Sequence, residues 1–258
     1  MPEPGEVVDF HVRLAPRPAA GEALLAGMDE LGITASVVVA GGLVRPEVLS
    51  RQLRDGGFVS GDIDNASVLS LAETSGGRLL PCYFGNPHGG LAAYREAGSR
   101  YVGLELSPAV HGIRLDAPVV ADFVSVAGEL GHWVYVVCIN RPGCDVPALA
   151  DLAAQHPEVT FVLGHLGYGN IDFHGLGLVA GRPNVVVETS GGYSSVLAFA
   201  VAELGSDRVL FGSEHPLQHP RVELTKVEVL DLPPAQRAAV LGGNARRLLM
   251  GRPDESRN

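Results

Sequence analysis

The chain has 258 residues, of which 46% are apolar and 19% are charged; this composition excludes a disordered or fibrous protein. Its 19 basic and 29 acidic residues give a net charge of −10, so no nucleic-acid or anionic-membrane partner is expected. No apolar run reaches the roughly 18 residues of a membrane span, and residues 1–6 lack the basic segment of a signal peptide. We therefore expect a cytoplasmic protein that acts on a small molecule.

Eight β-branched runs of strand length recur along the chain, each bounded by Gly, Pro or Asn. Their continuous apolar character is typical of parallel strands that are covered on both faces. In chain order they are Val7–Leu14, Ile33–Ala40, Arg78–Gly85, Tyr101–Ser107, Trp133–Asn140, Thr160–His165, Asn184–Thr189 and Arg208–Ser213.

Amphipathic segments of helical length alternate with these strands. They are Glu22–Leu31, Leu91–Ala97, Pro118–Leu130, Val146–Gln155 and Ser194–Leu204, with an extra helix at Pro46–Arg54 and a polar loop at Ser60–Asn65 in the longer second interval. Eight strand–helix units in about 250 residues are the size of a (β/α)8 TIM barrel. An open, doubly wound sheet is the alternative, because repeats do not show closure. We predict one barrel domain over residues 1–251 and a disordered polar tail over 252–258.

Ionisable residues fall near the ends of four predicted strands, where a barrel of this kind carries its chemistry. Asp9, His11 and Arg13 alternate with apolar residues on the first strand, so a period of two places them on one face. That face is either a polar exterior under a helix or an interior site, and burial there requires that the charges pair. The other strands contribute a second group: Glu105 and Ser107, His165 between two glycines, and Glu214.

Several segments resemble the amidohydrolase superfamily, in the order in which its members carry them. Residues 7–14, VVDFHVRL, resemble the first-strand Asp-x-His-x-His motif, and the segment LLAGMDELGITASVVV resembles the branch that includes aminocarboxymuconate-semialdehyde decarboxylase. The remaining similar segments are YVGLELSPAVHGIRLDAP, TFVLGHLG, NVVVETSGG, RVLFGSEHP and LGGNARRLL. The resemblance implies a (β/α)8 barrel that catalyses hydrolysis or non-oxidative decarboxylation.

The resemblance also implies a metal, often zinc, at the C-terminal mouth of the barrel, but this sequence departs from the usual ligand set. Arg13 stands where the second first-strand histidine belongs, the fifth strand has no histidine, and Glu214 replaces an aspartate. If a divalent cation is retained, His11, His165 and Glu214 are its expected ligands. Arginine cannot ligate and its charge repels a cation. A site without metal is therefore favoured, in which Arg13 takes the place of the cation and pairs with Glu105 or Glu214.

The predicted function is hydrolysis of a C–N or C–O bond, or decarboxylation, in a small anionic substrate. Glu214 is the expected general base, and His165 or His11 the group that transfers a proton. Substrate contacts are expected from Arg13, Glu105, His111 and Asn140. The alternative is a barrel that no longer catalyses and acts as a binding or scaffold protein. An enzyme would leave Arg13, His165 and Glu214 free to face a pocket, whereas a retired barrel would tie them in internal pairs. A homodimer is expected from the resemblance.

Overall fold

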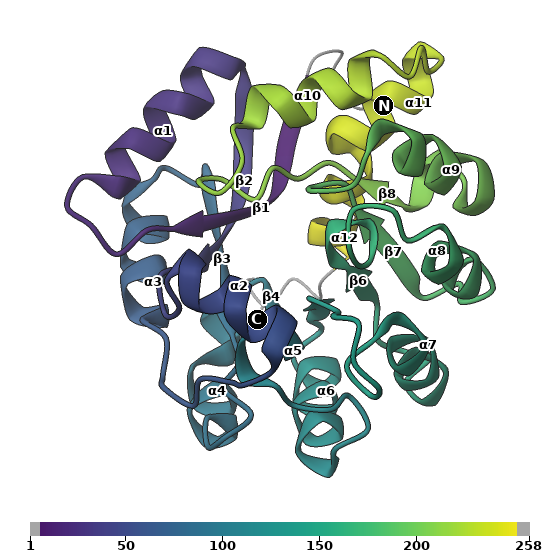
Figure 1. The fold of residues 1–258 in the computed structure, drawn as a ribbon. Coiled ribbons are helices and arrows are strands. Elements are labelled where there is room, and N and C mark those ends of the chain that lie inside the picture. Colours follow the sequence, from purple (N-terminus) through teal and green to yellow (C-terminus); the bar gives the residue numbers. More distant parts are fainter. Residues whose placement is uncertain (1–5, 252–258) are drawn as a thin grey trace.

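The computed structural model describes residues 6–251 and contains eight parallel strands whose order in space follows their order in the chain (Figure 1). The strands are β1 (Val7–Leu14), β2 (Ile33–Ala40), β3 (Leu79–Phe84), β4 (Gly103–Leu106), β5 (Trp133–Val136), β6 (Phe161–Leu163), β7 (Val185–Glu188) and β8 (Val209–Leu210). Helices surround them on the outside (Figure 1). The predicted single-domain (β/α)8 barrel is confirmed. The predicted tail, residues 252–258, lies outside the described residues.

The barrel is closed by backbone contacts between the segment that begins with β8 and the first strand. The N–H of Phe10 donates to the carbonyl of Phe211 at 2.8 Å, and the N–H of Arg13 donates to the carbonyl of His215 at 2.7 Å. In return, the N–H of Glu214 donates to the carbonyl of His11 at 2.9 Å. These bonds exclude an open sheet, and they bring the end of the last strand beside the polar half of the first.

The helices match the predicted segments closely where the sequence carries clear start and stop signals. α1 ends at Gly32, which adopts φ 66° and so provides the left-handed C-cap that a glycine allows. The described helices are α1 (Ala20–Leu31), α2 (Pro46–Asp55), α3 (Asn65–Thr74), α4 (Leu91–Ala97), α5 (Pro108–His111), α6 (Pro118–Glu129), α7 (Val146–Gln155), α8 (Phe173–Ala180), α9 (Ser194–Leu204), α10 (Pro220–Glu228), α11 (Pro234–Ala238) and α12 (Asn244–Met250). Of those within residues 6–251, no helix has the length and apolar character needed to span a bilayer.

The strands from β3 onward are shorter than predicted, chiefly at their C-terminal ends. The fifth was expected to reach Asn140 but ends at Val136. The chain then turns, because the N–H of Ile139 donates to the carbonyl of Cys144 and the N–H of Cys144 donates to that of Arg141, both at 2.8 Å. The apolar residues Val137, Cys138 and Ile139 thus belong to the loop after β5 and not to the strand.

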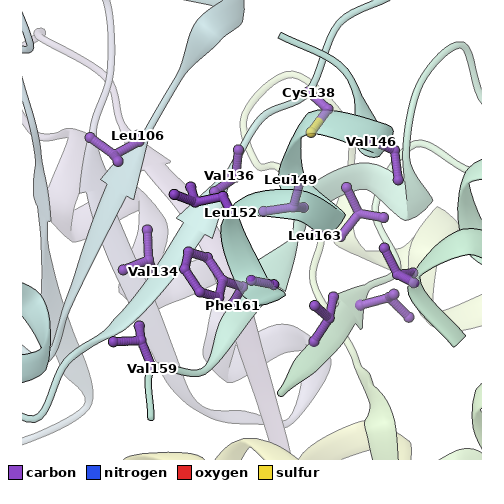
Figure 2. Packing of buried hydrophobic residues seen from close by; sticks show 14 of the residues in the cluster. Leu106, Val134, Val136, Cys138, Val146, Leu149, Leu152, Val159, Phe161 and Leu163 are labelled. Carbon is purple, nitrogen blue, oxygen red and sulfur yellow. The ribbon is translucent and has the colours of Figure 1, made fainter. Parts of the chain in front are cut away.

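The main hydrophobic layer lies between the strands and the surrounding helices. Figure 2 shows Val134 and Val136 of β5 and Phe161 of β6 beside Leu149 and Leu152 of α7. The first four of these are fully buried and Leu152 nearly so. Burying such side chains contributes about 1.5–3 kcal/mol each relative to leaving them exposed. This layer holds the strands in register and thereby fixes the positions of their C-terminal ends.

The first strand does not keep the period of two that the sequence analysis assumed. Its register with β2 shifts between Asp9 and Val12, which is a β-bulge or a similar irregularity. Phe10 and His11 therefore both contact aromatic rings of β5. The ring centroids of Phe10 and Trp133 lie 4.8 Å apart, and the ring of His11 stacks on that of Tyr135. The shift interrupts the simple alternation that the sequence analysis assumed, although His11 and Arg13 still reach the same two carboxylates, Glu105 and Glu214.

The extra helix α2 covers part of the mouth. The side-chain amide of Gln52 in α2 donates to the carbonyls of Ala109 and Val110 in α5, at 2.8 and 2.7 Å. Because α5 directly follows β4, α2 lies at the C-terminal end of the strands, beside α5 in Figure 1. Gln52 is buried, so this contact holds the helix in place over that side of the barrel.

Candidate active site

Four charged side chains form a closed ring at the C-terminal end of the barrel; we call His11, Arg13, Glu105 and Glu214 the ion quartet. Glu105 accepts from His11 Nε2 at 2.9 Å and from Arg13 Nη2 at 2.8 Å. Glu214 accepts from Arg13 Nε at 2.7 Å and makes a close ion pair with His11 Nδ1. Each carboxylate thus bridges the same two cations, and the structure contains both of the pairs that Arg13 was expected to choose between.

His11 is held as an imidazolium by this arrangement. Burial alone would lower its pKa, but the carboxylates of Glu214 and Glu105, one at each ring nitrogen, raise the pKa of His11 to about 10. Its ring also stacks flat on Tyr135, with centroids 4.2 Å apart and planes inclined by 2°. With His11 and Arg13 positive and both carboxylates negative, the quartet has no net charge.

The pKa values of both carboxylates of the quartet are lowered. Burial would raise the pKa of Glu214, but Arg13 and His11 hold it well below its usual value. The pKa of Glu105 is likewise lowered by Arg13 and His11, against the effect of its complete burial. A carboxylate with so low a pKa is a weak proton acceptor at neutral pH, which bears on the role expected for Glu214.

Arg13 keeps part of its guanidinium free. Its hydrogen bonds to described residues use Nε and Nη2, so Nη1 has no such partner. The side chain is 18% exposed, and its Cζ lies 5.6 Å from the centroid of the Phe84 ring. The ring and the carboxylates fix the plane of the guanidinium, and the remaining N–H groups can bind an anion that enters the mouth.

His165 lies next to the quartet, and a hydrogen bond to Ser190 holds its ring. Its ring centroid is 5.7 Å from that of His11, and its Nδ1 is 2.7 Å from Ser190 Oγ. His165 adopts φ 61°, a left-handed conformation that is unusual for a residue other than glycine. Nε2 makes no hydrogen bond to a described residue, and the side chain is 23% exposed. This nitrogen is the second open polar atom of the site.

The sequence analysis missed a buried acid, Glu188, that contacts the backbone of His165. Glu188, at the end of β7, is fully buried and accepts from the hydroxyl of Tyr135 at 2.7 Å. It also accepts from the N–H and hydroxyl of Ser190, at 2.6 and 2.8 Å, and from the N–H of His165 at 3.2 Å. The signal in the sequence was a single acid that ends the apolar run of β7. Its importance required knowing that β6 and β7 are neighbours.

The loop that follows β7 is anchored by the only lysine in the sequence. Lys226 Nζ donates to the carbonyls of Thr189 and Gly192, at 2.9 and 2.6 Å. The same ammonium pairs with Glu223, whose pKa burial raises to about 7 although Lys226 opposes this shift. These contacts span the loop that carries Ser190 and so hold it against His165.

The other predicted site residues lie outside the quartet. Asp9 is buried and accepts from the N–H of Ser213 at 2.9 Å, and burial raises its pKa to about 7. His111 is the last residue of α5, fully buried, with its ring 5.4 Å from that of Phe84; burial lowers its pKa to about 4. Asn140 is exposed in the loop after β5, and its side chain has no hydrogen bond to a described residue.

Comparison with known families shows which family the chain belongs to. The model of the amidohydrolase family matches residues 8–250. The chain belongs to the amidohydrolase family. Membership supports an amidohydrolase-type or decarboxylase activity. Among curated proteins, none matches the chain.

Solved structures related to this amidohydrolase share its fold over nearly the whole chain. An uncharacterised TIM-barrel protein from Bordetella bronchiseptica is 19% identical, with a TM-score of 0.74 and coverage of 96% of this chain and 100% of that one. The 5-carboxyvanillate decarboxylase from Sphingomonas paucimobilis is 14% identical, with a TM-score of 0.68 and coverage of 95% and 99%. A zinc-bound amidohydrolase from Burkholderia multivorans is 21% identical, with a TM-score of 0.68 and coverage of 96% and 99%.

The residues of this amidohydrolase do not fit the metal site that the resemblance implies. Both ring nitrogens of His11 face carboxylates, and Arg13 places a fixed positive charge among the same oxygens. A divalent ion needs three or four donor atoms that are free to ligate. Within residues 6–251 no three His, Cys, Asp or Glu side chains are grouped to hold one. Arg13 Nη1 and His165 Nε2 remain as polar atoms of this site that make no hydrogen bond to a described residue.

Proposed function

We propose that this chain is a hydrolase that cleaves a C–O or C–N bond in a small substrate carrying a carboxylate. The observation that carries the proposal is the pair of open polar atoms at the mouth: Arg13 Nη1, a cationic donor, and His165 Nε2, a ring nitrogen. Both side chains reach solvent. An oriented donor for negative charge and a group that can accept and return a proton are what ester or amide hydrolysis requires.

In the proposed reaction, His165 Nε2 removes a proton from a water molecule as its oxygen attacks the substrate carbonyl. The guanidinium of Arg13 holds the substrate carboxylate beside the reacting bond and donates from Nη1 to the oxyanion that develops. The C–O or C–N bond then breaks, and the proton on Nε2 passes to the departing alcohol or amine. His165 ends in its starting state, so the cycle needs no other proton carrier.

The quartet supports this reaction without exchanging protons itself. His11, with its pKa of about 10, keeps its proton at neutral pH, and Glu214 stays ionised because its pKa is lowered. We therefore assign proton transfer to His165 and not to Glu214 or His11, which the sequence analysis had preferred or included. In the proposal the two carboxylates and His11 fix Arg13, while Glu105 contacts the substrate only through that arginine.

A barrel that binds a ligand without catalysis is the second candidate. It is favoured by the quartet, in which Arg13 and Glu214 are tied in internal pairs, as expected of a retired site. Three features speak for an enzyme instead: the free Nη1 of Arg13, the free Nε2 of His165, and the strained backbone at φ 61° that aims this ring. Such strain is held by the surrounding structure and is concentrated at functional sites.

The test is a substrate panel with matched variants. Purified protein, with and without a chelator, is assayed against small lactones, esters and amides that carry a carboxylate, and against aromatic and enoic acids to detect decarboxylation. His165→Gln should lower kcat on any active substrate by about 100-fold or more. His174→Gln, the same change at an exposed histidine of α8, should leave it unchanged. Carboxylate binding without turnover would favour the binding barrel, and full activity in His165→Gln would refute the proposed role.

We also propose that the protein works in the cytoplasm on small molecules. Its net charge of −10 disfavours nucleic acid as a partner. A homodimer is our proposal for its assembly. Sedimentation at micromolar concentration should give a species of twice the chain mass, and a monomer at every concentration would contradict it.

A further inference from the structure

The two hydrogen bonds of the Ser190 hydroxyl determine which ring nitrogen of His165 carries the proton when the ring is neutral. The hydroxyl of Ser190 donates to Glu188 Oε2 at 2.8 Å, and a hydroxyl has only one proton to donate. Ser190 Oγ must therefore act as acceptor in its other bond, the 2.7 Å contact with His165 Nδ1. For that bond to form, Nδ1 must carry a hydrogen.

The series of hydrogen bonds from His165 through Ser190 ends at the carboxylate of Glu188. This carboxylate is fully buried and surrounded by donors: the hydroxyl of Tyr135, the N–H and hydroxyl of Ser190, and the N–H of His165. Tyr135 in turn lies between the two parts of the site, because its ring stacks on His11 while its hydroxyl contacts Glu188. Because Glu188 accepts each of these bonds, the hydroxyl of Ser190 is the donor in its contact with Glu188.

The same carboxylate also fixes the backbone. The N–H of His165 donates to Glu188 Oε2, and His165 adopts the left-handed conformation that such a bond must stabilise. Gly212 makes room for the acid, since a Cβ at this glycine would collide with Glu188 Oε1. Glu188 therefore holds His165 at two points, its backbone directly and its ring through Ser190.

We propose that Glu188, Ser190 and Tyr135 form a positioning unit that holds His165 as the Nδ1–H tautomer and directs the bare Nε2 to the mouth of the barrel. None of the three touches the substrate in the proposed reaction. They act through His165, because the nitrogen that accepts a proton is chosen by the bond that the other nitrogen makes. The inference rests on the proposed function for its catalytic meaning, but the tautomer itself can be observed without a substrate.

Nuclear magnetic resonance of protein with ¹⁵N-labelled histidine provides the test. The His165 signals are assigned by their loss in His165→Gln. In the wild-type protein, with the ring neutral, Nδ1 should give the resonance of a protonated ring nitrogen and Nε2 that of a bare one. In Ser190→Ala the preference should be lost, with the Nε2–H form appearing. Ser194→Ala, the same change at an exposed serine of α9, should leave the His165 signals in place.

A bare Nδ1 in the wild-type protein would overturn the inference, and so would an unchanged tautomer in folded Ser190→Ala. If Ser190→Ala does not fold, the wild-type spectrum alone decides, and Glu188→Gln supplies a second variant in which the preference should weaken. Turnover separates this inference from the proposed function. The Nδ1–H tautomer together with full activity of His165→Gln would retain the positioning unit and reject the hydrolytic role, whereas loss of activity with the opposite tautomer would do the reverse.

Discussion

Replacing Glu105 by glutamine removes one charge from the ion quartet with little change of shape. Glu105 is fully buried and lies 2.8 Å from Arg13 Nη2 and 2.9 Å from His11 Nε2. Glutamine can accept a hydrogen bond at one of these positions but supplies no charge. His11 and Arg13 then share Glu214 as the one remaining counter-ion within the quartet. The quartet, which was neutral, carries one excess positive charge.

The cost can be worked from these distances. At an effective dielectric constant of about 20, each contact corresponds to about 6 kcal/mol of Coulomb attraction. The desolvation of Glu105 offsets much of this, and breaking a buried ion pair by removing one partner typically costs about 3–5 kcal/mol. For a chain of this size that loss lowers Tm by about 6–20 °C. His11 should also lose its proton more readily, because one of the two carboxylates that raise its pKa is gone.

Urea unfolding followed by circular dichroism measures this loss. The matched control is Glu129→Gln, which removes the acid from an ion pair with Arg95 whose side chains are 60% and 58% exposed; it should cost at most about 1 kcal/mol. Adding Arg13→Met to Glu105→Gln removes one charge of each sign, so the double variant should lose less stability than the sum of the single changes. A loss below about 1 kcal/mol for Glu105→Gln would refute the view of the quartet as a coupled, buried set of charges.

Two further predictions concern pH and packing. The pKa of His11 is about 10 in the folded chain, against a reference of 6.5 for the unfolded chain. Its contribution to stability is therefore complete below pH 6.5 and is lost as the pH rises through about 10. The free energy of unfolding should therefore fall by about 1.4 kcal/mol from about pH 7.5 to about 8.5, and an unchanged slope in His11→Gln would contradict this source. Gly164→Ala should destabilise by about 1–3 kcal/mol because its Cβ would lie 2.5 Å from the Tyr135 hydroxyl. Gly27→Ala, with no atom within 4 Å of the new Cβ, should stabilise α1 by about 0.5–1 kcal/mol, and equal effects at both glycines in thermal unfolding would be inconsistent with the packing described.

The architecture could be predicted because each strand and helix carries its signals locally. β1, β2, α4, α7 and α9 occupy the predicted residues. Glycines flank β2 and α4 on both sides, and Asp145 is the N-cap of α7. The C-terminal ends of the later strands could not be placed, because an apolar residue after the last ladder bond, such as Ile139, reads like one inside it. α3, α8 and α10 were not predicted, and the bulge in β1 has no local signal.

The site could be predicted only in the part where one residue, Arg13, departs from the motif that the first strand resembles. Arg13 in a histidine position drew attention to Glu105 and Glu214 as partners, and the structure brings all three together with His11. The bonds from Glu188 to Ser190 and His165 join β7 to the end of β6, and no pattern within either segment reports on such a pair. The buried position of His111 was likewise beyond the sequence, because it depends on how α5 packs against Phe84.

The neutrality of the ion quartet determines how a ligand would experience the mouth of the barrel. A bare metal ion or an unpaired arginine draws anions from a distance, and dissolved salt screens that pull. Here the long-range fields of the four side chains largely cancel, so an arriving carboxylate gains little until it meets the guanidinium at contact distance. Its affinity would then depend on bond geometry rather than on ionic strength, and selection among anions would follow from their shape.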